Sequence, residues 1–454
     1  MSPDSRARPV LVAAAALAAA ALRVAALPLA GSTDVPFFRV WARYAASEGV
    51  GRLYGVGGRF PERRLLEDRG VRTKVDYPPV ALYELGIAAR VANAAAGTDA
   101  SERQRESHAN GAAPGAPASQ RAGESGGAKP PSLKMDRALT IAIKALVVCA
   151  ETGLAFLMIA AVSSVSTREV ATLAALRLWL DPGAIVIGSV LGYLEPLYLL
   201  PAMAAIVAAA RGRAAAAGAL FAVALLTKPI AVLFAPAIVA GICCAPGGGA
   251  RAVWRALAAA AVVAAAAIAP VAANGGLPNM LWGVGSLLRD PFLTGNAMNL
   301  WWLVSIVAAP PLEPSRVAGA IAVCATIGWA FVRMRRAADV AWVAAGAALA
   351  VHAYAVLAVS VHENHLFAAV PPLVVAASAR PRFRDVVAVV SAISFLNLAL
   401  MSGAEAIAAS PLVTPVAAVT AVANCAALAW HAWVFDRESR AIASIAADRR
   451  AAPA

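Results

Sequence analysis

Apolar residues in this chain come in blocks that are long enough to cross a lipid bilayer. One block covers residues 138–162, and the first runs from residue 9 to 31 with Arg23 inside it. A membrane-spanning helix needs about 20 mostly apolar residues. The first block is longer than the apolar region of a secretory signal, so we expect a retained transmembrane helix there. The pattern predicts an all-α protein, a polytopic transmembrane helical bundle.

Short basic stretches between the blocks indicate the topology. Each follows an apolar block, and consecutive stretches leave room for two crossings, so all five can lie in the cytoplasm as the positive-inside rule requires. We therefore expect about 11–14 crossings with the N-terminus inside. The five stretches are Arg211/Arg213, Arg251/Arg255, Arg333/Arg335/Arg336, Arg380/Arg382/Arg384 and Arg437/Arg440.

The same reasoning divides the chain into regions. We expect residues 1–97 to hold the first two transmembrane helices, the second near 79–97, around a large extracytoplasmic loop at 31–78. Residues 98–134 are rich in Glu, Ser, Gly, Pro, Ala and Gln and predict a disordered cytoplasmic linker. A bundle at 135–436 and a cytoplasmic tail at 437–454 follow. We also expect a third helix near 138–162. The Asp181-Pro182-Gly183 turn signal predicts a short hairpin, followed by one full helix that ends at about 210. Later outside loops are expected near 227–229, 271–315, 361–365 and 402–411.

Composition agrees with a membrane protein and narrows the function. Of 454 residues, 61% are hydrophobic and 14% charged, whereas soluble domains carry about 25% charged residues. The net charge of +13 comes mostly from Lys and Arg in short loops, without the basic stripe of a nucleic-acid surface. Nucleic acid is therefore not an expected partner. The cysteines lie in apolar segments and predict neither disulfides nor a zinc site; they are Cys149, Cys243, Cys244, Cys324 and Cys425.

The first outside loop is unusually basic. Residues 31–78 hold nine Lys or Arg against six Asp or Glu, which opposes the average charge rule for extracytoplasmic loops. Such a loop needs either a fold of its own or an anionic ligand.

Polar residues on the expected outside face gather in five short motifs. Each has a structural explanation as well: an Asp can end a helix, a Pro pair suits a helix N-terminus, and a Lys can reach the interface. A charge at membrane depth is nevertheless costly and usually functional, and all five motifs lie on one side. They are Thr33-Asp34-Val35-Pro36, Val75-Asp76-Tyr77-Pro78-Pro79, Gly192-Tyr193-Leu194-Glu195, Thr227-Lys228-Pro229 and His362-Glu363-Asn364-His365.

Carboxylates beside Lys and His are typical of a general base that faces an anion-binding group. A lysine and histidines next to a bilayer suit a phosphate carried on a lipid. The motifs therefore favour an extracytoplasmic site in a multi-pass protein of the cell inner (plasma) membrane.

The order of these motifs resembles the GT-C superfamily of polytopic glycosyltransferases. An Asp after the first helix, then Asp76-Tyr77-Pro78-Pro79, then Lys228-Pro229 and a late His362-Glu363 are similar to dolichyl-phosphate-glucose glucosyltransferases and bacterial polyprenyl-phosphate-mannose mannosyltransferases. The strongest likeness runs from Asp34 to Tyr54 and on to Pro79, and in outline it covers about residues 9–435 without the linker. Bacterial relatives often have Gly-Gln-x-Asp and a Gln after Lys-Pro, where this chain has Glu195 and Ile230, and eukaryotic ones follow His-Glu with Lys, where it has Asn364.

The resemblance implies a function and roles for residues. A hexose, mannose or glucose, would pass with inversion from a polyprenyl-phosphate-linked donor to a lipid or glycan acceptor of the cell envelope. Asp34 and Asp76 would be the catalytic carboxylates, with Asp34 as the base. Donor phosphate and substrate would contact the remaining motif residues: Tyr77, Glu195, Lys228, His362, Glu363 and His365. The sequence itself implies neither a metal nor a cofactor, although some members of the superfamily use a metal.

Two other classes stay open at this point. A secondary transporter or lipid flippase would also have many spans and interior charges such as Lys144, Glu151 and Arg177. Transporters often show internal repeats with polar residues near the middle of the membrane, whereas this chain shows no obvious repeat and its motifs lie at the mouths. An inactive scaffold is the third class.

Overall fold

A computed structural model describes most of the chain, and it is almost entirely helical. The described residues are 3–55, 66–68, 70–96, 133–287, 290–337, 339–401 and 413–451. The linker expected at 98–134 therefore lies almost entirely outside the described residues, since only its last two positions belong to a helix.

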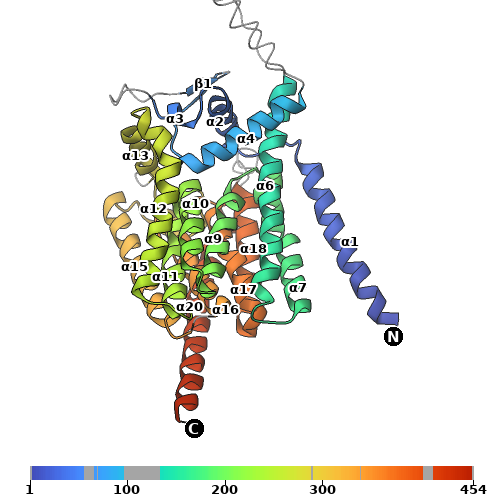
Figure 1. The fold of residues 1–454 in the computed structure, drawn as a ribbon, viewed down its shortest axis with the longest axis vertical. Helices are drawn as coiled ribbons and strands as arrows, with labels where there is room; N and C mark the ends of the chain where they lie inside the picture. Colours follow the sequence, from blue (N-terminus) through green and yellow to red (C-terminus); the bar gives the residue numbers. More distant parts are fainter. Residues whose placement is uncertain are drawn as a thin grey trace, which may run out of the picture.

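The helices form one bundle with a cap at one end, here called the upper end as in Figure 1. Within the described residues, six helices are long and apolar enough to cross a membrane, or seven if one pair bent by 46° counts as a single span. Five shorter apolar helices accompany them. If all of these cross, twelve segments pass through the bilayer, which lies within the expected range. The architecture is that of an all-α, multi-pass membrane protein.

The bundle helices follow one another in chain order. They are α1 (Pro3–Ala26), α6 (Leu133–Val162), α7 (Arg168–Trp179), α8 (Pro182–Ala184), η2 (Ile185–Val190), α9 (Glu195–Ala210), α10 (Ala214–Thr227), η3 (Pro229–Phe234), α11 (Ala235–Cys244), α12 (Ala250–Ala273), α15 (Leu312–Met334), α16 (Val340–Leu357), η5 (His365–Ala369), α17 (Val370–Ala379), η6 (Pro381–Phe383), α18 (Arg384–Met401) and α20 (Val413–Ala451).

The cap is built from the first loop, from α4 and from one later segment, α13 (Figure 1). Its first part packs Phe38 and Trp41 against Leu82 and Leu85, which gives the upper end a hydrophobic core of its own. Arg43 contacts Asp136 at 2.8 Å and so ties the cap to α6. The cap elements are α2 (Val35–Ser47), α3 (Val50–Leu53), the antiparallel pair β1 (Leu66–Asp68) and β2 (Val71–Thr73), α4 (Pro79–Ala95) and α13 (Leu277–Ser286). The short helix α14 (Leu300–Val307) packs on α16 and α20.

The position of α4 differs from the expected second crossing at 79–97. This helix lies across the upper end and packs on α2 and α6 (Figure 1), and it is not among the helices apolar enough to span a membrane. Its 17 residues include Glu84 and Arg90, which oppose burial in lipid. As a result α6 runs downward, α7 with η2 returns upward, and α9 leads down to Arg211.

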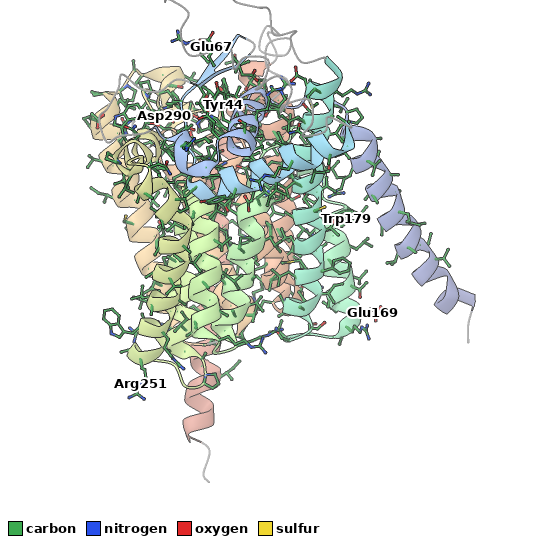
Figure 2. All side chains as sticks on the ribbon, turned by 45° about the horizontal axis from the view of Figure 1, so that its top comes forward. Tyr44, Glu67, Glu169, Trp179, Arg251 and Asp290 are labelled. Carbon is green, nitrogen blue, oxygen red and sulfur yellow. The ribbon has the colours of Figure 1, made fainter. Side chains whose placement is uncertain are left out.

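The basic stretches do meet at the other end, the lower end of Figure 1. Figure 2 places Arg251 there. Arg333 pairs with Asp436 at 3.0 Å, and Arg380 and Arg382 both contact Glu438. The grouping that the positive-inside rule predicted is thus present, although α4 does not form the crossing at 79–97 that was inferred from it. At Asp181 the rising segment bends by 46° and does not form the expected hairpin. The Asp181 side chain caps α8 after the bend by accepting from the Ala184 amide at 3.1 Å.

Small residues allow the bundle helices to approach closely. A Cβ at Gly218 of α10 would lie 1.9 Å from the Ala256 carbonyl of α12, and one at Gly319 of α15 would lie 2.5 Å from the Leu357 carbonyl. The central helix α16 is buried along almost its whole length. Backbone-to-backbone packing of this kind gives the upper end a rigid base.

Candidate active site

The loop that carries Asp34 is fixed to the bundle from two sides. Lys144 of α6 is fully buried and donates to the carbonyls of Ala26 at 3.1 Å and Leu29 at 2.9 Å. The Ser32 amide donates to the Leu191 carbonyl at 2.8 Å. These contacts cap the end of α1 and bring the start of α2 beside the segment before α9.

Glycine is required where these two segments meet. Gly31 has a φ of +88°, and a Cβ there would lie 2.9 Å from the Leu191 carbonyl. Gly192 has a φ of +73° and lies against Val35 and Lys144. A larger residue at either position would separate Asp34 from Glu195, because side chains rarely adopt this backbone conformation and would clash here.

Lys228 and Glu195 form a buried ion pair close enough to Asp34 to act on its charge. The Lys228 ammonium donates to Glu195, whose side chain is fully buried. Pro229 disfavours a helical conformation in the residue before it, and Lys228 is extended between α10 and η3. Its ammonium nitrogen also lies 5.8 Å from the centre of the Tyr77 ring. The break between these two helices thus presents one cation to the site.

Tyr77 forms a wall of the site together with the aromatic residues of α2. Its ring centre is 5.3 Å from Trp41 and 5.9 Å from Phe38. Tyr54 donates a hydrogen bond of 2.5 Å to the Tyr77 carbonyl. This packing fixes the position of the neighbouring Asp76.

The segment between α16 and η5 brings His362 and Glu363 to the same place. Glu363 is buried and accepts a hydrogen bond from the Tyr193 hydroxyl. The His362 side chain is 44% exposed, and its Nε2 lies 3.9 Å from a carboxylate oxygen of Asp290. Figure 2 shows Asp290 at the upper end, the end that also carries Tyr44 and Glu67.

Asp34 is the point where these groups converge electrostatically. Burial raises its pKa above the ordinary 3.8; Lys228 and His362 oppose that rise, while Glu363 and Glu195 add to it. Burial likewise raises the pKa of Asp76 to about 6, against the opposing effect of Lys74, whose ammonium lies 3.7 Å away. A carboxylate with a raised pKa is a stronger base, which suits proton abstraction near neutral pH.

The structure therefore brings five of the eight predicted site residues together: Asp34, Glu195, Lys228, His362 and Glu363. Asp76 lies beside this group and Tyr77 forms its wall. His365 belongs to the group only in part, since it is buried with its ring packed between Tyr354 and His362, 5.8 and 5.6 Å away.

Two residues of the site were not predicted. Tyr193 lay within a recognised motif but carried no role, and Asp290 is a single acid in a long loop. That Asp290 belongs to the site can be recognised only in the folded structure, where residues 290–299 pack against His362.

The described residues hold no cluster of three or more His, Cys, Asp or Glu side chains that could hold a metal ion.

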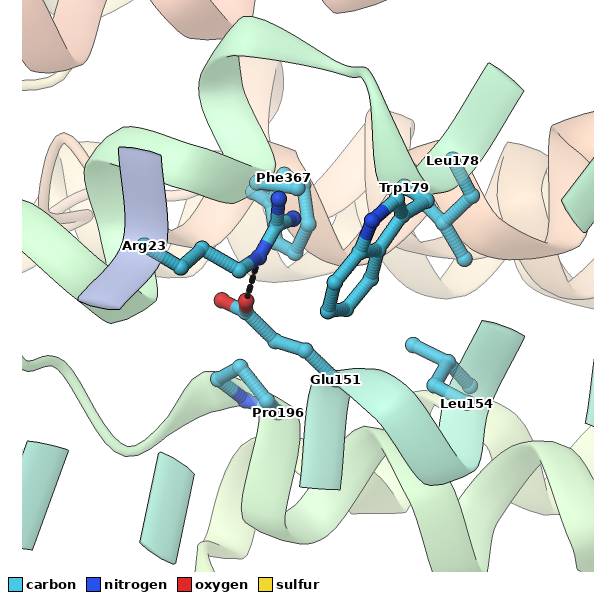
Figure 3. Close-up of a pocket in the computed structure, with 8 residues that line it drawn as sticks. Arg23, Glu151, Leu154, Leu178, Trp179, Pro196 and Phe367 are labelled. Atoms are coloured by element: carbon cyan, nitrogen blue, oxygen red, sulfur yellow. Dashed lines mark hydrogen bonds and ion pairs between the residues drawn. The ribbon is translucent and has the colours of Figure 1, made fainter. Parts of the chain in front are cut away.

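A separate, small pocket of about 10 Å³ lies between α1, α6 and α7. Figure 3 shows the Arg23 guanidinium above the Glu151 carboxylate, with Trp179 beside it. The Arg23 Nε donates to Glu151 at 2.7 Å, and both side chains are buried. This pair joins α1 to the bundle and is distinct from the cluster around Asp34.

Comparison with known proteins adds no relative to this geometry. No protein-family model matches the chain, and no curated protein matches it. The likeness to the GT-C superfamily stays a prediction that rests on the motifs.

Proposed function

We propose that this protein is an integral membrane glycosyltransferase that transfers a hexose from a polyprenyl-phosphate-linked donor to an extracytoplasmic lipid or glycan acceptor. The observation that carries the proposal is the convergence of carboxylates and cations from four distant parts of the chain around Asp34. Asp34, Glu195, Lys228 and His362 are far apart in sequence, and costly charges gathered at membrane depth are usually functional.

The chemistry follows from the charges. Asp34, whose pKa burial raises, takes the proton of an acceptor hydroxyl. The acceptor oxygen then forms a bond to the anomeric carbon, on the face opposite the phosphate, while the bond from that carbon to the phosphate oxygen breaks. Configuration inverts, and the polyprenyl phosphate leaves with the electron pair.

The leaving phosphate gains negative charge in this step, so cations placed in advance lower the barrier. Lys228 and His362 are the cationic groups next to Asp34. The proposal uses Glu195 to hold Lys228 and Tyr193 to hold Glu363, because each makes a buried contact with its partner. The basic first loop has a reason in the same scheme, since the donor that it faces is an anion.

The test is sugar transfer in membranes that contain wild type or Asp34→Asn. A panel of radiolabelled polyprenyl-phosphate sugars is offered with an envelope lipid extract as the acceptor. Glu67→Gln is the matched control, because Glu67 is an exposed carboxylate on β1 at the same end. We expect transfer from one donor with wild type and control, and a loss of about 100-fold or more with Asp34→Asn, in the range of general acid–base catalysis.

The other outcomes overturn part or all of the proposal. If Asp34→Asn transfers as well as wild type, Asp34 is not the base. If folded wild type transfers from no donor in the panel, the glycosyltransferase proposal fails and a transporter or flippase replaces it.

A further inference from the structure

Residues 290–299 form a wall against the segment that carries His362. The Ser360 amide donates to the Leu293 carbonyl at 3.0 Å, and the Gly295 amide donates to the Val361 carbonyl at 2.8 Å. The Ser360 hydroxyl contacts the carbonyls of Asp290 and Phe292 at 3.1 and 2.8 Å. These hydrogen bonds set the position of the wall relative to His362.

Two buried asparagines in the bundle hold this wall from below. Asn397 of α18 accepts from the Met298 amide and donates to the Asn296 carbonyl, each at 2.9 Å. Asn424 of α20 donates to the Met298 carbonyl at 2.9 Å. Because both asparagines are almost fully buried, these hydrogen bonds are shielded from water and rigidify the segment.

The wall brings Asp290 to the imidazole of His362. Its carboxylate lies 3.9 Å from Nε2, and the Phe292 ring meets the imidazole edge-on at 5.6 Å between centres. A Cβ at Gly295 would lie 2.9 Å from Nδ1, so only glycine permits this approach. The imidazole is thus confined on two sides, while 44% of the side chain stays exposed.

The charges around His362 are mixed. Burial by itself lowers the pKa of His362, but the carboxylates of Asp290, Glu363 and Asp34 outweigh burial and the Lys228 ammonium, so the pKa is raised above 6.5. The nearby His365 imidazole packs on His362 from η5. Glu363 already accepts from Tyr193, and Asp34 is the proposed base, which leaves Asp290 as the acid dedicated to His362.

We propose that Asp290 is a positioning residue that holds the His362 imidazole in its protonated, cationic form, oriented for the phosphate of the donor. This inference rests on the proposed function for the identity of the anion, whereas the Asp290–His362 pair itself does not depend on it. The histidine supplies the positive charge, and the wall of 290–299 sets where that charge stands.

A direct test is the titration of His362 by NMR in detergent micelles, with ¹⁵N-labelled histidine. The chain has only five histidines, and the variant His362→Gln identifies the signal. We expect Asp290→Asn to lower the titration midpoint of His362 by about one pH unit or more, the usual effect of losing one nearby opposite charge. The control Glu67→Gln, at an exposed carboxylate on β1 that pairs with Arg72, should leave the midpoint unchanged.

Transfer kinetics supply the second readout. With the donor that is active in the panel, Asp290→Asn should raise KM more than it lowers kcat and should move the alkaline limb of the pH profile to lower pH. Asp290→Glu should recover most of both, because it restores the charge. This variant also keeps the test sharp if Asp290→Asn folds poorly.

The outcomes separate the two proposals. An unchanged His362 midpoint in folded Asp290→Asn overturns the inference, even if wild type transfers sugar. If Asp290→Asn lowers the His362 midpoint but wild type transfers no sugar, the Asp290–His362 pair is supported and the proposed function is overturned.

Discussion

The buried pair of Arg23 and Glu151 offers a quantitative test of how α1 is held. Figure 1 shows α1 approaching the bundle at its C-terminal end and leaning away towards its N-terminus. The two side chains are 1% and 6% exposed, and the guanidinium carbon stacks 3.8 Å from the Trp179 ring centre. Gly188 makes room for the carboxylate, since a Cβ there would lie 1.8 Å from Glu151 Oε1.

Replacing Arg23 by Met leaves a buried carboxylate without its partner. Breaking such a pair costs about 3–5 kcal/mol, and the lost contact with Trp179 belongs to this total. Replacing both residues by Met removes the uncompensated charge as well, and buried ion pairs replaced by apolar residues are commonly neutral or more stable by about 1–4 kcal/mol. We therefore expect the double variant to be more stable than either single variant.

The measurement is unfolding in mixed micelles with a rising share of SDS, followed by tryptophan fluorescence. Arg251→Met is the matched control, because Arg251 is exposed at the lower end and surface changes alter stability by about 0.5 kcal/mol or less. If Arg23→Met loses no more stability than this control, or if the double variant loses the sum of both single losses, the two charges are not energetically coupled as argued.

Two further predictions concern the site and the packing. The transfer rate should fall as pH drops through the pKa of Asp34, which burial raises, because a protonated base accepts no proton; it should fall again as pH rises through the raised pKa of His362, where the cation is lost. An acid limb that begins only below the ordinary carboxylate range would contradict Asp34 as the base. Gly218→Ala should destabilise the protein by about 3 kcal/mol or more, the upper end of the usual cost of overpacking, since its Cβ would meet the Ala256 carbonyl at 1.9 Å. Gly328→Ala, with no atom within 4 Å of the new Cβ, should be neutral or gain up to about 1 kcal/mol from helix propensity, and thermal unfolding of both variants checks this pair.

The sequence was informative where charge decides position. Arginine is costly in lipid and is enriched in cytoplasmic loops, so the basic stretches were expected at one end. Contacts such as those of Arg380 and Arg382 with Glu438 place them together. The same logic located the polar motifs at the opposite end. The crossing expected at 79–97 was wrong although Glu84 and Arg90 oppose burial of this segment in lipid; the packing of residues 79–95 on α2 and α6 could not be read from the sequence.

Asp290 shows why part of the site escaped prediction. Nothing in the residues next to it in sequence marks it as functional, and its partner His362 is 72 positions away. The contact arises from the asparagines in α18 and α20 that hold 290–299 in place. Tertiary contacts of this kind leave no periodic or compositional signal in a single sequence.

The two groups of buried charges in this protein differ in what surrounds them, and the difference favours catalysis over transport. Interior charges serve to join helices: Lys144 caps α1, and Arg23 pairs with Glu151. A transport path would need such groups to face an open route near mid-membrane. The cluster around Asp34, which is half-buried, instead combines the buried side chains of Glu195, Glu363 and Lys228 with a histidine that is 44% exposed. An accessible histidine beside a half-buried carboxylate, both held by rigid segments, is the arrangement that the proposed glycosyltransferase would need to bind an anionic lipid donor at the membrane surface and to activate an acceptor next to it.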